Sequence, residues 1–392
     1  MIPFALQYII VIVLTMVISV ISTPLIRFLS FRIGAVDKPN ERRINTVPMP
    51  TAGGLAIFVA FFLATMCLLP VVVTHISPKG TYFEYSLPLV IASSIIVFTG
   101  LIDDIKELRP MPKMVGMLLA ATIIWVFTEF RFDNFKIPFG GPMLHFPAWL
   151  SFFLTILWIV AITNAVNLID GLDGLVSGVS IISLTTMGIV SYFFLHNSNL
   201  YLTLTVFVLV AAIIGFLPYN YHPAIIYLGD TGALFIGFMI GVLSLQGLKN
   251  STAVAVVTPM IILGVPITDT LVAIIRRTLS GQKIYEADRM HLHHRLLSLG
   301  LTHRGTVLVI YAISFIFSLI SLLLNVSSRL GGVLLMIALL FGVEILSELI
   351  GIFGENRTPI LNLLRFIGNS DARQEYLAKR RTKRAKQQKK RE

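Results

Sequence analysis

Side chains suited to metal and phosphate chemistry occur in three short motifs of an otherwise apolar chain. Asp103 and Asp104 are adjacent in GLIDD, residues 164–175 read NAVNLIDGLDGL, and YLGDTGA carries Asp230 between glycines. Neighbouring carboxylates repel each other unless a cation or a proton compensates their charge. Several oxygen ligands suit Mg²⁺ or Mn²⁺, and Mg²⁺ is often bound together with phosphates. The motifs therefore favour a divalent-cation site.

The spacing of polar residues in NAVNLIDGLDGL predicts a polar helical face. Asn164, Asn167 and Asp170 are three residues apart, and Asp173 continues the series. Residues three apart lie on one side of a helix. Polar stripes also join membrane helices to each other, but two carboxylates with no basic partner nearby are unusual in that role. We expect Asn164, Asp170 and Asp173 to bind substrate and Asn167 to contribute to the metal site.

The other acidic motifs also have structural interpretations. Asp103 and Asp104 follow an apolar run, so they could mark its water boundary or cap the next segment. Asp230 begins another apolar run and could be its N-cap. We expect instead that Asp103, Asp104 and Asp230 converge with the acidic pair of NAVNLIDGLDGL on one cavity.

Basic residues that could bind anionic oxygens lie mainly in the segment 276–297, which contains ADRMHLHHRLL. A group of histidines and arginines favours phosphate contacts, although structural histidines or a zinc site remain alternatives. The motif has no cysteine, which weighs against zinc. The candidate basic residues are Arg289, His291, His293, His294, Lys38, Arg42 and Lys113. Carboxylates, a metal and basic groups on one surface would support phosphoryl transfer.

Membrane spans are the elements that would position these residues. The chain has 392 residues, of which 56% are hydrophobic and 13% charged, whereas soluble domains carry about 25% charged residues. Apolar runs of about 20 residues recur, enough to cross a bilayer as helix. We predict an all-α polytopic integral membrane protein with about 11 transmembrane helices. The expected spans are 4–30, 52–73, 86–101, 113–129, 149–166, 175–195, 200–218, 232–248, 253–275, 305–325 and 330–353, with ten spans as an alternative that omits 175–195.

The charge distribution predicts the topology. All but five of the 31 lysines and arginines lie in alternate loops, at one span end or in the C-terminal tail, and basic residues favour the cytoplasmic side. The N-terminus is therefore expected outside, and the tail and the acidic motifs inside. We divide the chain into a transmembrane catalytic domain, 1–353, and a basic cytoplasmic tail, 354–392. The tail is predicted to be solvated or to contact membrane lipids, and no nucleic-acid partner is expected because no aromatic platform accompanies the charge.

The motifs GLIDD, NAVNLIDGLDGL, LGDTGA, PITD and ADRMHLHHRLL, in this order, resemble the polyprenyl-phosphate N-acetylhexosamine-1-phosphate transferases over residues 1–353. That resemblance implies an all-helical membrane enzyme with a cytoplasmic cleft. Its members transfer a sugar 1-phosphate from a UDP-sugar to a polyprenyl phosphate, usually undecaprenyl phosphate in bacteria, and release UMP. They require Mg²⁺ or Mn²⁺. A bacterial plasma-membrane location follows, and a homodimer is compatible with the family.

The resemblance also assigns roles by position. It makes Asp230 a principal metal ligand, with Asn167 and Asp104 as further candidate ligands. It also gives Asp103 and Asp104 the ordering of the metal or the deprotonation of the lipid phosphate. Asp170 and Asp173 fall in the nucleotide-proximal motif. The remaining matches are Lys113 near the phosphates and His291, His293 and His294 at the sugar and diphosphate end.

The motif details favour the N-acetylglucosamine-1-phosphate branch, which initiates teichoic acid, O-antigen and related glycans. HLHH, the preceding ADR and the first-loop pattern KPN-ERR carry this preference. The muramoyl-pentapeptide branch of peptidoglycan synthesis is the alternative. A secondary transporter, suggested by Glu344 and Glu348 in the last span, is the alternative from a different class. It is disfavoured because the chain has no clear internal repeat.

Overall fold

The structure is a computed structural model that describes residues 3–37, 47–73, 79–136, 142–194, 200–246, 260–261, 263–279 and 291–350. Helices dominate the described residues, as expected. They are α1 (Phe4–Ile33), α2 (Gly54–Leu63), α3 (Leu69–Val73), α4 (Lys79–Lys106), α5 (Pro110–Phe127), α6 (Ala148–Leu168), α7 (Leu175–Phe194), α8 (Leu200–Asn220), α9 (Gly229–Gln246), α11 (Gly264–Leu279), α12 (Leu292–Ser298), α13 (His303–Val326) and α14 (Arg329–Ile350). Residues 64–68 form a π-helical turn that joins α2 to α3.

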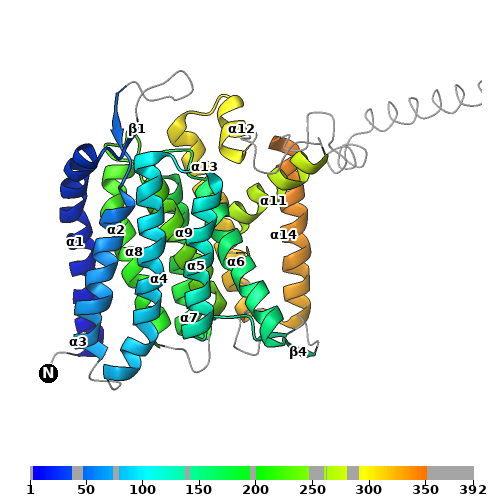
Figure 1. Cartoon of the computed structure of the whole chain (residues 1–392). Helices are drawn as coiled ribbons and strands as arrows, with labels where there is room; N and C mark the ends of the chain where they lie inside the picture. The colour runs from blue at the N-terminus through cyan, green and yellow to red at the C-terminus, as the bar shows by residue number, and fades with distance from the viewer. Residues whose placement is uncertain are drawn as a thin grey trace, which may run out of the picture.

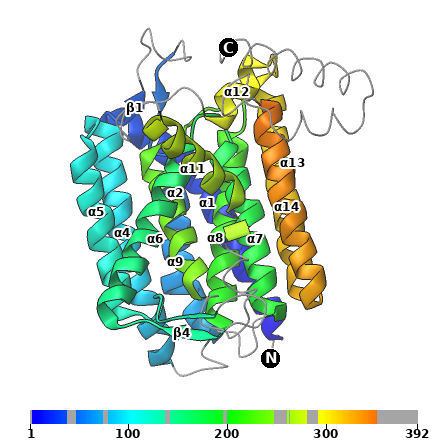
Figure 2. The ribbon, with the colours of Figure 1, turned by 90° about the vertical axis from the view of Figure 1, so that its right-hand side faces the viewer.

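Two short antiparallel hairpins mark opposite ends of the helical bundle. Strands β1 (Val36–Asp37) and β2 (Met49–Pro50) pair after α1, and β3 (Asn134–Lys136) pairs with β4 (Met143–His145) between α5 and α6. Figures 1 and 2 show β1 and α12 at one end of the bundle, and β4 with the N-terminus at the other. We call the end that carries β1 and α12 the polar end.

Within the described residues, eight helices are long and apolar enough to cross a membrane, and α9 and α14 contain shorter apolar stretches of 10–17 residues. The span expected at 175–195, which the ten-span alternative omits, is present as α7 and meets the same criterion. The expected ninth span, 253–275, lies partly outside the described residues, and its described part belongs to α11. The tail, 354–392, lies completely outside the described residues. The protein is therefore an all-α, multi-pass membrane protein.

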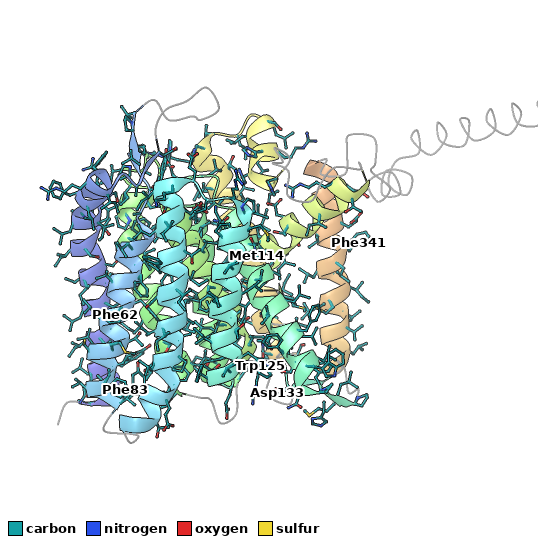
Figure 3. The ribbon with its side chains drawn as sticks, viewed as in Figure 1. Phe62, Phe83, Met114, Trp125, Asp133 and Phe341 are labelled. Carbon is teal, nitrogen blue, oxygen red and sulfur yellow. The ribbon has the colours of Figure 1, made fainter. Side chains whose placement is uncertain are left out.

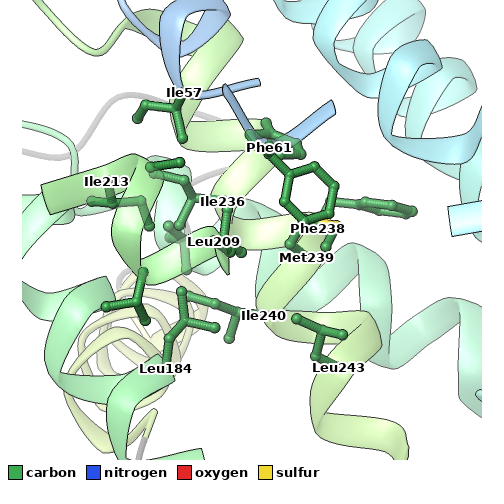
Figure 4. Close-up of a cluster of buried hydrophobic side chains, with 14 of the residues drawn as sticks. Ile57, Phe61, Leu184, Leu209, Ile213, Ile236, Phe238, Met239, Ile240 and Leu243 are labelled. Atoms are coloured by element: carbon green, nitrogen blue, oxygen red, sulfur yellow. The ribbon is translucent and has the colours of Figure 1, made fainter. Parts of the chain in front are cut away.

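Helix α9 is the centre of the bundle. Helices α4 and α6 flank it closely, and α2 contacts it as well. Large apolar side chains of α9, including Phe238, Met239 and Ile240, are buried in a cluster that also contains side chains of α2, α7 and α8 (Figure 4). Burying such side chains is worth roughly 1.5–3 kcal/mol each in water, while close packing supplies most of the attraction within a bilayer. The first residue of α9 is thus held in a fixed position at the polar end.

The outer surface of the bundle carries the apolar side chains that a lipid environment accepts. Phe62, Phe83, Met114 and Phe341 are each more than a third exposed and project from different helices (Figure 3). Trp125 differs, because its indole N–H donates to the Ser151 hydroxyl near β3 and β4. The exposed apolar surface is consistent with eight helices of spanning length.

Candidate active site

The polar end places the candidate metal ligands at the start of α9. Asn167, in the last turn of α6, donates from its amide to Asp230 Oδ1. Lys113, near the start of α5, lies with Nζ 3.2 Å from Asp230 Oδ2. Two helices, α5 and α6, therefore each present one side chain to the carboxylate that α9 carries. The expectation that Asp230 and Asn167 lie together is confirmed.

Asp103 shares the lysine with Asp230. Its Oδ2 forms an ion pair with Lys113, and its Oδ1 accepts from the backbone N–H of Leu108 at 2.6 Å. Asp103 is almost fully buried, and Lys113 is partly buried. Lys113 thus neutralises two carboxylates that would otherwise repel each other. Asp103 is close to Asp230, as expected, and is fixed by the turn between α4 and α5.

Asp104 caps α9 from another helix. Its Oδ1 accepts from the backbone N–H of Asp230 at 3.0 Å, and its Oδ2 accepts from the backbone N–H of Thr231 at 3.0 Å and from the Thr231 hydroxyl. The first N–H groups of a helix have no partner within the helix, and a carboxylate there also interacts favourably with the helix dipole. Both oxygens of Asp104 hold the first turn of α9, and through that turn they fix Asp230.

Glycines allow α9 to begin this close to its neighbours. Gly229 has a φ of +70°, and a Cβ there would lie 1.7 Å from the carbonyl oxygen of Thr51 and 2.7 Å from Asp104 Oδ2. A Cβ on Gly100 of α4 would lie 2.6–2.7 Å from backbone atoms of Asp230 and Thr231. Gly229, the first glycine of LGDTGA, is therefore required both by its backbone conformation and by its close contacts.

Asp170 faces the same cluster from the turn after α6. Burial, together with the negative charges of Asp230, Asp104 and Asp173, raises the pKa of Asp170 well above its usual range. Asn164 and Asn167 both lie in α6, as predicted, but the prediction that Asp170 continues their helical face is wrong, because α6 ends at Leu168. Asn164 donates instead to the Val160 carbonyl of its own helix, at 2.8 Å, and contacts Met117 of α5.

Asp173 belongs to a second cluster that the sequence reasoning missed. Its Oδ2 lies 2.8 Å from His222 Nδ1 and accepts from the backbone N–H of Ala224. The rings of His222 and His303 stack with centroids 4.1 Å apart. The ligand atoms of Asp173, His222 and His303 lie within 4.8 Å of one another, the one described group of three such side chains with that proximity. Burial and the Asp173 charge also raise the pKa of nearby Tyr227.

The expectation that five aspartates form one cavity is therefore only partly met. Asp103 and Asp230 share Lys113, and Asp104 accepts from the backbone N–H of Asp230. Burial, together with the charges of Asp230 and Asp104, raises the pKa of Asp170. The carboxylate of Asp173 is paired with an imidazole instead. His222 and His303 carried no spacing signal, since they are 81 positions apart by number and meet only because α8 ends and α13 begins at the polar end.

The histidine motif contacts the NAVNLIDGLDGL segment. A Cβ on Gly171 would lie 2.2 Å from His293 Nε2, so only a glycine leaves room for that ring. The rings of His291 and His293 are parallel within 2°, with centroids 6.1 Å apart, and His293 and His294 are 4.2 Å apart. Burial and the neighbouring His294 lower the pKa of His293 to about 4. His293 is therefore neutral at pH 7.

Two further contacts hold the histidine motif and the NAVNLIDGLDGL segment in place. Asp269 of the PITD motif bonds His291 Nδ1, a partnership that no spacing rule indicated. The Tyr311 hydroxyl donates to the Gly174 carbonyl, which joins α13 to the same segment. Three of the predicted substrate-binding residues, Lys38, Arg42 and Arg289, lie outside the described residues.

Comparisons with known proteins show what the chain is similar to. The sequence profile of glycosyl transferase family 4 matches residues 86–248. The chain is 38% identical over 349 residues to a Bacillus subtilis protein named probable undecaprenyl-phosphate N-acetylglucosaminyl 1-phosphate transferase, covering 88% of this chain and 93% of that protein. It is 35% identical over 318 residues to the decaprenyl-phosphate N-acetylglucosaminephosphotransferase of Mycobacterium tuberculosis, covering 75% and 77%. The undecaprenyl-phosphate alpha-N-acetylglucosaminyl 1-phosphate transferase of Escherichia coli is 25% identical over 285 residues, covering 71% and 73%.

Proposed function

The chain belongs to glycosyl transferase family 4 as a membrane sugar-1-phosphate transferase, and we propose that it transfers N-acetylglucosamine 1-phosphate from UDP-N-acetylglucosamine to undecaprenyl phosphate. UMP is the second product. The observation that carries this proposal is the cluster at the start of α9, in which side chains from α4, α5, α6 and α9 meet at Asp230. The names of the relatives support the acceptor and the sugar.

The donor set at Asp230 fits a hard divalent cation. Asp230 offers carboxylate oxygens and Asn167 offers an amide oxygen, and oxygen ligands are those that Mg²⁺ and Mn²⁺ prefer. Asp230 and Asn167 would hold the ion, which when bound neutralises the negative charge of a diphosphate. Asp104 had also been expected to bind the ion, but its hydrogen bonds to α9 favour a positioning role. Asp104 keeps Asp230 in place while substrates enter and leave.

The reaction requires an oxygen of the lipid phosphate to attack the β-phosphorus of the UDP-sugar. A new oxygen–phosphorus bond forms there, and the bond between the β-phosphorus and the oxygen bridging to the α-phosphate breaks, so UMP leaves. Asp103 is the side chain that we assign to receive a proton from the lipid phosphate, since its carboxylate lies beside Lys113 at the polar end. Lys113 then supplies positive charge to phosphate oxygens during transfer.

We assign the NAVNLIDGLDGL segment and the histidine motif that packs on it to the other parts of the donor. Asp170 and Asp173 lie in the segment between α6 and α7, and His293 packs on Gly171 within it. Asp170 and Asp173 are assigned to the nucleotide, and His291, His293 and His294 to the sugar and diphosphate. Such neutral and charged hydrogen-bonding groups can orient a sugar nucleotide without blocking the β-phosphorus.

We further propose that the polar end faces the cytoplasm of a bacterial plasma membrane and that the reaction begins synthesis of a surface glycan. Basic residues favour the cytoplasmic side of a membrane. Among the described residues, the arginines at the end opposite the polar end are Arg131 and Arg329, and this small number supports the proposed orientation. A tag on the C-terminus should be cleaved by protease in inverted vesicles and protected in right-side-out vesicles. Cleavage only in right-side-out vesicles would reverse the topology.

The donor can be identified with one assay. Purified protein with undecaprenyl phosphate is supplied in turn with radiolabelled UDP-N-acetylglucosamine, UDP-N-acetylgalactosamine and UDP-N-acetylmuramoyl-pentapeptide. We expect label in the lipid fraction with the first donor, in equal amount to the UMP released. Transfer of the muramoyl-pentapeptide alone would assign the protein to the peptidoglycan branch, and label in none of the lipid fractions would contradict the proposed function.

A further inference from the structure

Asp269 and His291 form a buried carboxylate–imidazole pair that joins α11 to the start of α12. Asp269 Oδ2 lies 3.0 Å from His291 Nδ1, and Asp269 Oδ1 accepts from the backbone N–H of Leu292 at 2.9 Å. The exposed fractions of Asp269 and His291 are only 6% and 5%. The carboxylate is therefore held at both oxygens, one of them by the first backbone N–H of α12.

The pair lies beside the donor region. The His291 ring is parallel to that of His293, and the His293 ring packs on Gly171 in the segment that carries Asp170 and Asp173. His291 is thus one ring away from the NAVNLIDGLDGL segment. Among the described residues, Asp269 has no hydrogen bond to that segment. Any effect of Asp269 on substrate binding there must therefore pass through His291.

The chemistry of the two groups determines which ring nitrogen of His291 carries the proton. An ionised carboxylate only accepts hydrogen bonds, so the nitrogen that faces it, Nδ1, must carry the proton. Nε2 is then the nitrogen left for a substrate. The hydrogen bond made by one ring nitrogen sets the state of the other, and partners of this kind also fix the ring orientation.

We propose that Asp269 is a positioning residue that holds His291 as the Nδ1-protonated form with Nε2 available to the diphosphate or sugar of the donor. The proposal rests on the proposed function for its catalytic consequence. A competing explanation is that Asp269 only caps α12. The two explanations differ in what an isosteric amide does, because an amide keeps the cap and changes the proton.

The variant Asp269→Asn separates these explanations. The amide oxygen of asparagine still accepts from Leu292 N–H, but its NH₂ group donates toward Nδ1, so His291 must place its proton on Nε2. We expect kcat to fall about 10- to 100-fold, as for other residues that orient a functional histidine, with the KM for undecaprenyl phosphate unchanged. In a His291→Gln background, Asp269→Asn should cause no further loss, since residues that act as a unit are not additive.

Thr302→Ala provides a matched control for the loss of a helix cap. The Thr302 side chain accepts from Gly305 N–H at the start of α13, and it has no described hydrogen bond to Asp269 or His291. We expect this variant to lower thermal stability with kcat retained. Multiplication of the two losses in the Asp269→Asn, His291→Gln double variant, or full kcat in Asp269→Asn alone, would overturn the proposal.

A second measurement does not depend on the donor. In protein labelled with ¹⁵N-histidine, the signals of His291 are identified by their loss in His291→Gln. We expect Nδ1 of His291 to be protonated in the wild type and unprotonated in Asp269→Asn. An Nε2–H, Nδ1-unprotonated form in the wild type would refute the positioning role even if transfer occurs. A wild type with the expected spectrum but no transfer would instead refute the proposed function.

Discussion

The two acidic clusters at the polar end use the same residue type with different partners. At the start of α9, Asp103 and Asp230 share Lys113, and Asp230 also accepts a hydrogen bond from the Asn167 amide. In the second region, Asp173 pairs with His222, and Asp269 pairs with His291. The first set offers oxygen ligands and compensating positive charge, which suits a divalent cation and phosphates. The second set fixes imidazole rings, which suits recognition of a larger polar substrate.

The largest expected effect separates the two clusters by activity. Asp230→Ala removes the carboxylate shared by Asn167 and Lys113, and we expect UMP release to fall at least about 10³-fold, equivalent to about 4 kcal/mol of barrier. Asp173→Ala should cost about 10- to 100-fold, because it disturbs the orientation of His222 and of the nucleotide. Both variants should be purified as folded protein and measured at saturating donor. Equal losses would remove the distinction between the clusters.

The roles of Asp103 and Asp104 can be separated by the thermal stability of their asparagine variants. Asp104→Asn replaces one accepting oxygen by an NH₂ group that faces a backbone N–H of α9, which costs about 1–3 kcal/mol for an unsatisfied buried donor. We therefore expect a lower melting temperature together with reduced turnover. Asp103→Asn retains an oxygen for Leu108 N–H and should lower turnover with a smaller change in melting temperature. A larger stability loss in Asp103→Asn would contradict the assignment of Asp104 as the cap of α9.

Particular residues show how far the sequence could predict this architecture. Most spans were recognisable because each needs only its own run of apolar residues, and Asp230 was recognisable because it stands alone at the start of such a run. The cap formed by Asp104 was not predictable as a contact, since its partners are more than 120 residues away. The helical spacing of Asn167 and Asp170 misled because α6 ends between them. His222, Asp269 and His303 needed the packing of α8, α11 and α13 to become visible.

A smaller effect is expected at the contact between the clusters. Gly171→Ala would place a methyl group against His293 Nε2 and displace α12 by the amount that the ring must move. A displacement of about 1 Å near a reacting group can cost up to about 10²-fold, and we expect a loss of about tenfold in turnover. Gly300→Ala is a control for packing, because no atom lies within 4 Å of the added Cβ, although its φ of +90° will cost some stability. Wild-type turnover in Gly171→Ala would show that the histidine motif need not pack there.

The smallest effect is a pH dependence of the packing of α12. The pKa of His293 is about 4 in the folded protein, below its ordinary value near 6.5. Between these values the unfolded or undocked state binds more protons, so the packing is strongest above pH 6.5 and weakens as pH falls toward 4. We expect about 2 kcal/mol less protection of α12 at pH 5 than at pH 7 in amide hydrogen exchange, after correction for intrinsic rates. His293→Gln should abolish this difference, and its persistence would assign the effect to another group.

The central claim is that a divalent cation binds at Asp230 and Asn167 and not at the group formed by Asp173, His222 and His303. Electron paramagnetic resonance of Mn²⁺ titrated into the purified protein measures this directly. We predict one bound ion in the wild type and in His222→Ala, loss of binding in Asp230→Ala and weaker binding in Asn167→Ala. Mn²⁺ bound with wild-type affinity in Asp230→Ala but lost in His222→Ala would contradict the account.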